Sequence, residues 1–146
     1  MSTMVREILA EKGPQVYSIG PDANVFEALG RLSEHDVGAL LVLDGGAPVG
    51  VFSERDYARK VILQGRASRD TRIVEVMSSP VITVGIDASV QRCMARMTRY
   101  RIRHLPVVDE SGELAGMVSI GDLLKATIAE QEFEIDGLQS YIAGTE

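Results

Sequence analysis

Residues 100–122 read Tyr-Arg-Ile-Arg-His-Leu-Pro-Val-Val-Asp-Glu-Ser-Gly-Glu-Leu-Ala-Gly-Met-Val-Ser-Ile-Gly-Asp, and this stretch decides the fold. The apolar run at 105–108 is typical of a strand that is covered on both faces. An aspartate and a glycine then predict a turn, so a second strand at 114–118 completes a hairpin. The second strand runs directly into Ser119 and Asp122, a pattern typical of the start of a helix.

The same pattern occurs earlier in the chain, which indicates an internal repeat. A shift of 65 residues aligns 16–44 with 81–109 and gives nine identical positions. A shift of 66 residues then aligns 50–56 with 116–122, where a glycine, a serine and an aspartate coincide. Two copies predict a pair of related units within one chain, not a solenoid.

Each copy predicts the order β-α-β-β-α. Extended segments at 16–19 and 81–84 lead into amphipathic runs that begin at Val25 and Val90, where a helix with one buried face is expected. An aspartate lies three residues before each run, and these residues, Asp22 and Asp87, are expected to be the N-caps.

The hairpin of the first copy is predicted at 39–43 and 48–52, around an Asp-Gly-Gly turn. Its second strand runs into Ser53 and Asp56, as in the second copy. The serine can accept hydrogen bonds from the first helical turn, and the aspartate favours the positive end of the helix. A helix N-terminus of this kind also attracts phosphate.

A polar segment at 64–73 separates the copies and carries Arg66, Arg69 and Arg72. This composition is typical of a solvated linker, and the alternative is a mobile loop near a phosphate.

The chain beyond Leu124 is predicted to be helical, and its acidic run at 130–134 is expected to be a solvated face. A chain of 146 residues has a limited core to cover the apolar positions of this tail. Part of the tail is therefore expected to form a dimer contact, and the alternative is packing on its own domain. The apolar positions are Ile128, Phe133, Ile135, Leu138, Tyr141 and Ile142.

Composition limits the function classes. A net charge of −6 disfavours nucleic acid as a partner, because nucleic-acid binding normally needs a basic surface. A single cysteine, Cys93, excludes an internal disulfide and a multi-cysteine zinc site, so it is expected to be a core thiol. His35 is expected at the surface. No apolar run of about 18 residues predicts a membrane span, and no signal-peptide core is present, so a cytoplasmic protein is expected.

With both hairpins in place, the chain resembles a tandem pair of cystathionine-β-synthase (CBS) domains, and in particular bacterial proteins that consist of such a pair alone. The segments that carry the resemblance are 37–44 with 49–57, and 100–109 with 114–123. The resemblance implies an α/β (α+β) fold, in which two units related by a pseudo-twofold axis pack through their sheets.

This organisation sets the expected domain boundaries. They are a first CBS domain at 8–63, a linker at 64–73, a second CBS domain at 74–127 and a C-terminal helical tail at 128–146. The first copy departs from the pattern at Leu41, where the second copy has Pro106.

The resemblance also implies that clefts between the units bind AMP, ADP, ATP or NAD(H), with no required cofactor and no metal. The Ser and Asp of each copy would contact ribose and phosphate, with helix capping as the structural alternative. The first copy has Gly38 and Ala39 in place of Arg103 and His104, so its pocket is expected to suit a less anionic ligand unless Arg55 supplies charge. The expected nucleotide-binding residues are Lys12, Tyr17, Val37, Gly38, Ala39, Ser53, Arg55, Asp56, Met77, Ile82, Ile102, Arg103, His104, Met117, Ser119 and Asp122.

The leading hypothesis is a regulatory protein that forms a homodimer, senses adenine nucleotides, changes conformation and acts on an unidentified protein partner. The sequence shows no activated nucleophile or acid–base pair of the kind that catalysis needs. Two alternatives stay open. One is a structural or partner-binding CBS protein without a ligand, and the other is a nucleotide hydrolase in which Asp56 or Asp122 activates water.

Overall fold

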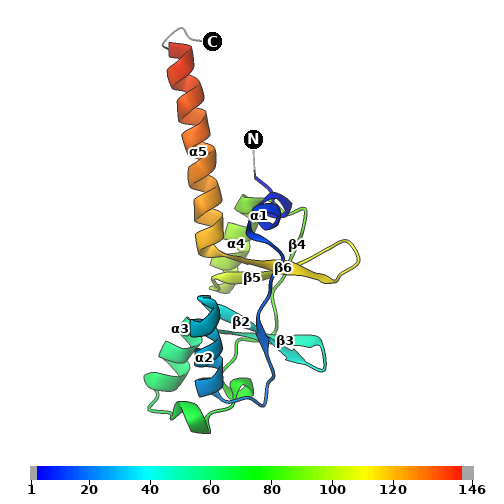
Figure 1. The fold of residues 1–146 in the computed structure, drawn as a ribbon, viewed down its shortest axis with the longest axis vertical. Helices are drawn as coiled ribbons and strands as arrows, with labels where there is room; N and C mark the ends of the chain where they lie inside the picture. The colour runs from blue at the N-terminus through cyan, green and yellow to red at the C-terminus, as the bar shows by residue number, and fades with distance from the viewer. Residues whose placement is uncertain (1–2, 143–146) are drawn as a thin grey trace. The chain divides into compact units, whose positions relative to one another are not determined.

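The computed structural model describes residues 3–142, and contacts within the chain divide it into two compact units. The first-copy unit comprises residues 15–82, and the second-copy unit comprises residues 1–14 and 83–146. Each unit holds one three-stranded sheet with helices, so the fold is mixed α+β as predicted (Figure 1).

The first-copy unit follows the predicted β-α-β-β-α order. Its sheet has the strand order β1-β2-β3, with β1 parallel to β2 and β2 antiparallel to β3. Its core joins Leu40, Val42 and Phe52 of the sheet to the buried face of the first helix, and all three are fully buried. Its elements are β1 (Ser18–Ile19), α2 (Val25–His35), β2 (Ala39–Asp44), β3 (Ala47–Ser53), α3 (Glu54–Tyr57), a π-helical turn (Ala58–Ile62) and two 3₁₀ turns (Ser68–Asp70 and Ile73–Glu75).

The second-copy unit repeats this plan with the strand order β4-β5-β6. Cys93 lies in its core with no exposed surface, as predicted, and burial raises the pKa of its thiol. Its elements are α1 (Val5–Lys12), β4 (Val84–Gly85), α4 (Val90–Tyr100), β5 (His104–Val108), β6 (Leu114–Ser119) and α5 (Ile120–Ile142).

Helix α1 was not predicted, and it belongs to the second-copy unit although it precedes the first copy in sequence. The N–H of Val5 donates to the carbonyl of Ala88 at 2.9 Å, and the N–H of Val90 donates to the carbonyl of Thr3 at 3.0 Å. Val5 is fully buried. These non-local contacts hold the N-terminal segment on the second-copy unit, where α1 packs against β6 (Figure 1).

The N-caps predicted at Asp22 and Asp87 are wrong. The capping residues are Asn24 and Ser89, whose side-chain oxygens accept a hydrogen bond from the backbone N–H three residues later, at 2.8 and 3.1 Å. An N-cap directly precedes the first helical residue, so the two aspartates lie two residues too early. Each aspartate instead pairs with an arginine, at 3.3 and 2.6 Å.

By the contacts within the chain, the segment 64–73 belongs to the first-copy unit. Thr71 is 2% exposed, and its hydroxyl donates to the carbonyl of Ala67 at 2.8 Å. The three arginines each contact a side chain of the same unit. Arg66 pairs with Glu75, Arg69 lies 3.7 Å over the ring of Phe26, and Arg72 pairs with Asp22.

Candidate functional site

The second-copy unit holds Ser119 and Asp122 at the junction of β6 and α5. The N–H of Asp122 donates to Ser119 Oγ at 3.1 Å, and the N–H of Ser119 donates to Asp122 Oδ2 at 2.8 Å. This reciprocal pair is a capping box, so the predicted helix start is confirmed. The cap holds the Asp122 carboxylate in one place at the first turn of α5.

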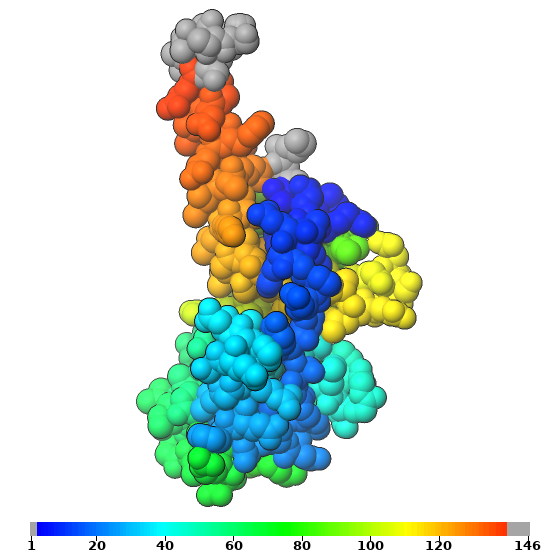
Figure 2. Space-filling view, in the orientation of Figure 1, coloured from blue at the N-terminus to red at the C-terminus, as the bar shows by residue number. Residues whose placement is uncertain are grey.

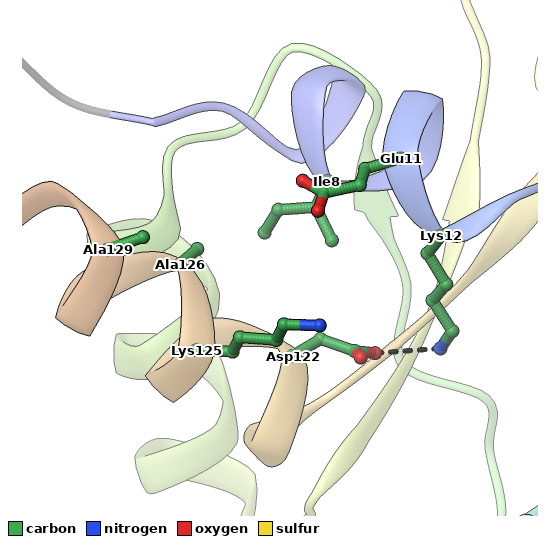
Figure 3. Close-up of a pocket in the computed structure, with 7 residues that line it drawn as sticks. All are labelled: Ile8, Glu11, Lys12, Asp122, Lys125, Ala126 and Ala129. Atoms are coloured by element: carbon green, nitrogen blue, oxygen red, sulfur yellow. Dashed lines mark hydrogen bonds and ion pairs between the residues drawn. The ribbon is translucent and has the colours of Figure 1, made fainter.

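Lys12 reaches this carboxylate from the end of α1. Its ammonium donates to Asp122 Oδ2 at 2.7 Å and to the carbonyl of Met117 at 2.8 Å (Figure 3). The Lys12 side chain is 38% exposed and that of Asp122 is 23% exposed. Lys12 therefore links α1 to both β6 and α5, through Met117 and Asp122.

The pKa of Asp122 is lowered from its ordinary value. Burial by itself would raise this pKa, but the hydrogen bonds from Lys12 and from the backbone of Ser119, together with the lysine charge, outweigh burial. Asp122 is therefore ionised at neutral pH and can act only as a hydrogen-bond acceptor.

A pocket of about 320 Å³ opens beside this pair, between α1 and α5 of the same unit (Figure 3). Ala126 and Ala129 on α5 are small enough to leave room for the pocket. Side chains of both positive and negative charge border it. Lys12 extends from α1 toward Asp122, and Lys125 lies next to Asp122 on α5. The residues that line the pocket are Ile8, Glu11, Lys12, Asp122, Lys125, Ala126 and Ala129.

The equivalent carboxylate of the first-copy unit, Asp56, is held more completely. Ser53 caps α3 and bonds Asp56 Oδ2 through its backbone N–H at 3.0 Å. The hydroxyl of Ser78 donates to Asp56 Oδ1 at 2.9 Å, and the ammonium of Lys60 lies 3.1 Å from the same oxygen. Asp56 is 8% exposed.

The two carboxylates therefore differ in what they can offer a ligand. Both oxygens of Asp56 are bonded inside the protein. At Asp122 the bonds go to Oδ2, and no protein donor among residues 3–139 reaches Oδ1. Asp122 thus keeps one acceptor oxygen available on a partly exposed carboxylate. Both oxygens of Asp56 already accept bonds within its own unit.

The strand ends of the two units bring the other predicted residues close to these serines. His104 pairs with Ser119 across β5 and β6, and Ala39 pairs with Ser53 across β2 and β3. The carbonyl of Arg103 accepts a hydrogen bond from the backbone N–H of the first residue of α5 at 2.9 Å. The carbonyl of Gly38 accepts the equivalent bond from the first residue of α3 at 3.1 Å. Arg103 is exposed.

The predicted residues thus divide between the two units. The second-copy unit contains Lys12, Ile102, Arg103, His104, Met117, Ser119 and Asp122. The first-copy unit contains Tyr17, Val37, Gly38, Ala39, Ser53, Arg55, Asp56, Met77 and Ile82.

Tyr17 directly precedes β1, and Ile82 lies two residues before β4. The ring of Tyr17 stacks on His35, with 3.8 Å between the ring centroids and 10° between the planes. His35 lies at the surface as predicted, but its stacking was missed. One face of the Tyr17 ring is therefore covered by this neighbour.

Sequence reasoning missed several residues around the two carboxylates. Lys60 lies four residues after Asp56, a spacing that brings side chains together on a helix and that could have indicated the pair. No such spacing pointed to Ser78, Glu11 or Lys125. Ser78 and Glu11 come from segments distant in sequence from the carboxylates that they lie near. The pocket beside Lys125 forms only when α1 packs on the second-copy unit.

No group of three or more His, Cys, Asp or Glu side chains in the described part of the chain could hold a metal ion. None of the described helices combines the length and the apolar character that crossing a membrane requires.

Known proteins resemble this chain both in sequence and in structure. The family model described as "CBS domain" matches residues 5–62 and 73–129. Among curated proteins, the mitochondrial CBS domain-containing protein CBSX3 of Arabidopsis thaliana is 38% identical over 152 residues, which cover 98% of this chain and 73% of that protein.

Solved structures match over most of the chain. A CBS-domain protein of Burkholderia ambifaria, named for signal transduction, is 45% identical with a TM-score of 0.83, covering 88% of this chain and 96% of that one. The CBS domain pair of protein MJ0100 is 27% identical with a TM-score of 0.77, covering 89% and 99%. That pair was solved in complex with 5′-methylthioadenosine and S-adenosyl-L-methionine.

Proposed function

Because this chain belongs to the CBS domain family, whose stand-alone pairs are generally regulatory, we propose that it is a regulatory protein that binds an adenosine-containing ligand. The ligands we propose are AMP, ADP, ATP or NAD(H). The observation that carries this proposal is the carboxylate of Asp122, which is ionised, fixed by a cap and left with an unbonded oxygen.

The chemistry of this carboxylate suits a ribose. Ribose hydroxyls are donors, and an ionised carboxylate is a strong acceptor that forms charge-assisted hydrogen bonds. The capping box keeps Asp122 from rotating, so little side-chain freedom is lost on binding. Lys12 and the exposed Arg103 supply positive charge for phosphate, and Lys125 adds a further cation beside the pocket.

Of the two copies, we place the tighter site in the second-copy unit. Asp56 would have to break its bonds to Ser78 and Lys60 before it could accept a hydrogen bond from a ligand. This loss reduces the net free energy that a ligand gains by binding there. The first-copy residues Tyr17, Gly38 and Arg55 form, in this proposal, a weaker second site. The known ligands of the MJ0100 pair support an adenosine-containing class for the family.

Binding would act through α5. A ligand that bonds Asp122 also contacts the first turn of this helix and the lysine that ties α1 to it. Ligand binding then favours the arrangement of these elements in which the bonds are best formed, by no more than the difference in affinity between the two states. We propose that the protein acts as a homodimer on a protein partner.

A hydrolase is the less favoured alternative. A general base that works near neutral pH needs a pKa near that pH, whereas the pKa of Asp122 is lowered. Release of phosphate from ATP, or of AMP from NADH, by the purified protein would overturn the non-enzymatic proposal.

The test is calorimetric titration of the full chain with adenosine, AMP, ADP, ATP, NAD, NADH and S-adenosylmethionine, with GTP as the specificity control. We expect an adenosine compound to bind and the Asp122→Asn variant to lose about tenfold or more in affinity, since a charged acceptor is removed. Asp56→Asn is the matched variant at the equivalent position and should lose less affinity while lowering the melting temperature.

Either of two results would contradict the proposal. Absence of heat with every adenosine compound would leave the partner-binding alternative. Equal loss of affinity in both aspartate variants would show that Asp122 has no special role.

A further inference from the structure

Helix α5 extends well past the rest of the second-copy unit. Its first turns are packed, since Leu123 is fully buried and the hydroxyl of Thr3 donates to Glu130 at 3.2 Å. Every side chain described from 131 to 139 is exposed. Figures 1 and 2 show this orange part of α5 continuing beyond α1 and α4 with no other element of its unit over it in either view.

Four of the five large apolar residues described as exposed on α5 lie on one side of the helix. Leu124, Ile128, Ile135 and Leu138 are 49%, 53%, 52% and 62% exposed. With Gln131 they follow a spacing of four, three, four and three residues, which is the heptad pattern of a coiled coil. We call these five residues the α5 seam. A stripe this narrow is typical of a helix that faces one other helix, rather than a core.

We propose that the α5 seam binds the α5 seam of a second copy of this chain, as a parallel and in-register two-stranded coiled coil. The identities of the residues support two parallel strands. Isoleucine occupies both a positions, 128 and 135, and leucine occupies the d positions 124 and 138, a combination that favours parallel dimers. The polar d residue, Gln131, would favour one register over slipped ones.

The charges beside the seam fit the same arrangement. In a parallel pair, a g residue faces the e residue of the next heptad in the partner. These pairs are Thr127 with Glu132 and Glu134 with Gln139, so no like charges meet. An antiparallel pair centred between Glu132 and Glu134 would instead place carboxylates opposite one another, which is destabilising. The acidic flanks also disfavour an anionic lipid or nucleic acid as the occupant.

The seam is short for an isolated coiled coil, but α5 is not an isolated peptide. Its first turns are fixed by the Ser119–Asp122 cap and by packing of Leu123, so the costly nucleus of the helix already exists in each monomer. The partner seam has to order only the part of the helix that projects. We therefore expect a dimer that forms reversibly and depends on protein concentration.

Phe133 provides a control within the same helix. It is the most exposed of the large apolar residues described, at 80%, but it lies at position f, on the opposite side of the helix from Ile135. The proposed pairing leaves it uncovered. Substitutions at Phe133 and within the α5 seam therefore distinguish specific pairing through the seam from nonspecific hydrophobic association of the tail.

The first test is disulfide trapping of full-length Gln131→Cys under mild oxidation, with Phe133→Cys as the matched control. Symmetric d positions approach each other in a parallel in-register pair, and f positions do not. We expect Gln131→Cys to form a covalent dimer and Phe133→Cys to stay at the wild-type level, since Cys93 is fully buried. Equal trapping of the two variants, or none at 131, would overturn the proposal.

The second test is sedimentation equilibrium of Ile135→Glu and Phe133→Glu. A charge placed within the seam should weaken dimerisation about tenfold or more, whereas the same charge at 133 should not. Equal dissociation constants for the two variants would contradict the seam.

This inference rests on the homodimer of the proposed function and not on the nucleotide. If Ile135→Glu binds the nucleotide normally but Gln131→Cys is not trapped, only the seam fails. If trapping succeeds and no adenosine compound binds, only the nucleotide site fails.

Discussion

Asp122 and Asp56 occupy equivalent positions of the repeat, but their surroundings give the two carboxylates different chemistry. Asp122 exchanges bonds with Ser119 and Lys12 and keeps an oxygen at the surface. Asp56 is enclosed by Ser53, Ser78 and Lys60. A capping motif therefore identifies where a carboxylate lies but does not decide whether a ligand can use it.

The lowered pKa of Asp122 predicts how stability depends on pH. Its folded-state pKa lies below that of the unfolded chain, so its stabilisation is present above the unfolded-state pKa and is lost as the pH falls through the folded-state value. Wild type should exceed Asp122→Asn in unfolding free energy by about 1 kcal/mol at neutral pH. The gap should begin to narrow below about pH 5 and vanish as the pH falls through the folded-state pKa of Asp122. Urea unfolding between pH 7 and pH 2 measures it, and a gap that stays constant to pH 2 would contradict the Lys12 contact.

At the scale of elements, the segment that precedes each copy packs on the other copy. Leu9 of α1 covers Gly116 on β6, and Met77 covers Gly50 on β3. A Cβ at Gly116 would meet the Leu9 side chain at 2.8 Å, and a Cβ at Gly50 would meet Met77 Sδ at 2.5 Å and the carbonyl of Ser78 at 3.0 Å. The two glycines allow this close approach.

Substitution of these glycines by alanine should therefore have unequal costs. Gly50→Ala should lower the unfolding free energy by about 1–3 kcal/mol, because the Ser78 carbonyl is bonded to Val51 and cannot withdraw freely. Gly116→Ala should cost less, because only a flexible leucine has to move. Thermal and urea unfolding of both variants measures the difference, and a larger loss for Gly116→Ala would contradict this packing.

At the scale of the whole molecule, the projecting part of α5 contributes no packing within its own monomer among the residues described to 139. The predicted alternative in which the tail packs on its own domain is therefore wrong for 131–139. Tyr141 and Ile142, which the sequence also assigned to the apolar stripe, lie outside the residues whose side chains are described.

Truncation after Glu130 tests the role of this tail. At low protein concentration the melting temperature should change by less than about 2 °C, because the removed side chains that are described, at 131–139, are all exposed. At high concentration the wild type should melt higher and the truncated chain should not, since association stabilises only the former. Differential scanning calorimetry over a range of concentrations measures both. A large loss at every concentration would mean that the tail stabilises its own monomer.

The sequence by itself determined the repeat, the β-α-β-β-α order and the two capping boxes at Ser53 and Ser119. These features depend on local patterns: apolar periodicity, turn residues and the spacing of a serine and an aspartate within one helical turn. The N-cap errors at Asp22 and Asp87 also have a local cause, since several polar residues precede each helix and only geometry selects the one that caps it.

Only the tertiary structure decided which segments join each unit. Helix α1 docks on the second copy, and this brings Lys12 to Asp122 across 110 residues of sequence. Likewise, folding brings the hydroxyl of Ser78 to Asp56, where it donates a hydrogen bond to Oδ1. Such pairs depend on non-local packing that no spacing in the sequence encodes, so the difference between the two carboxylates becomes visible only when the chain has folded.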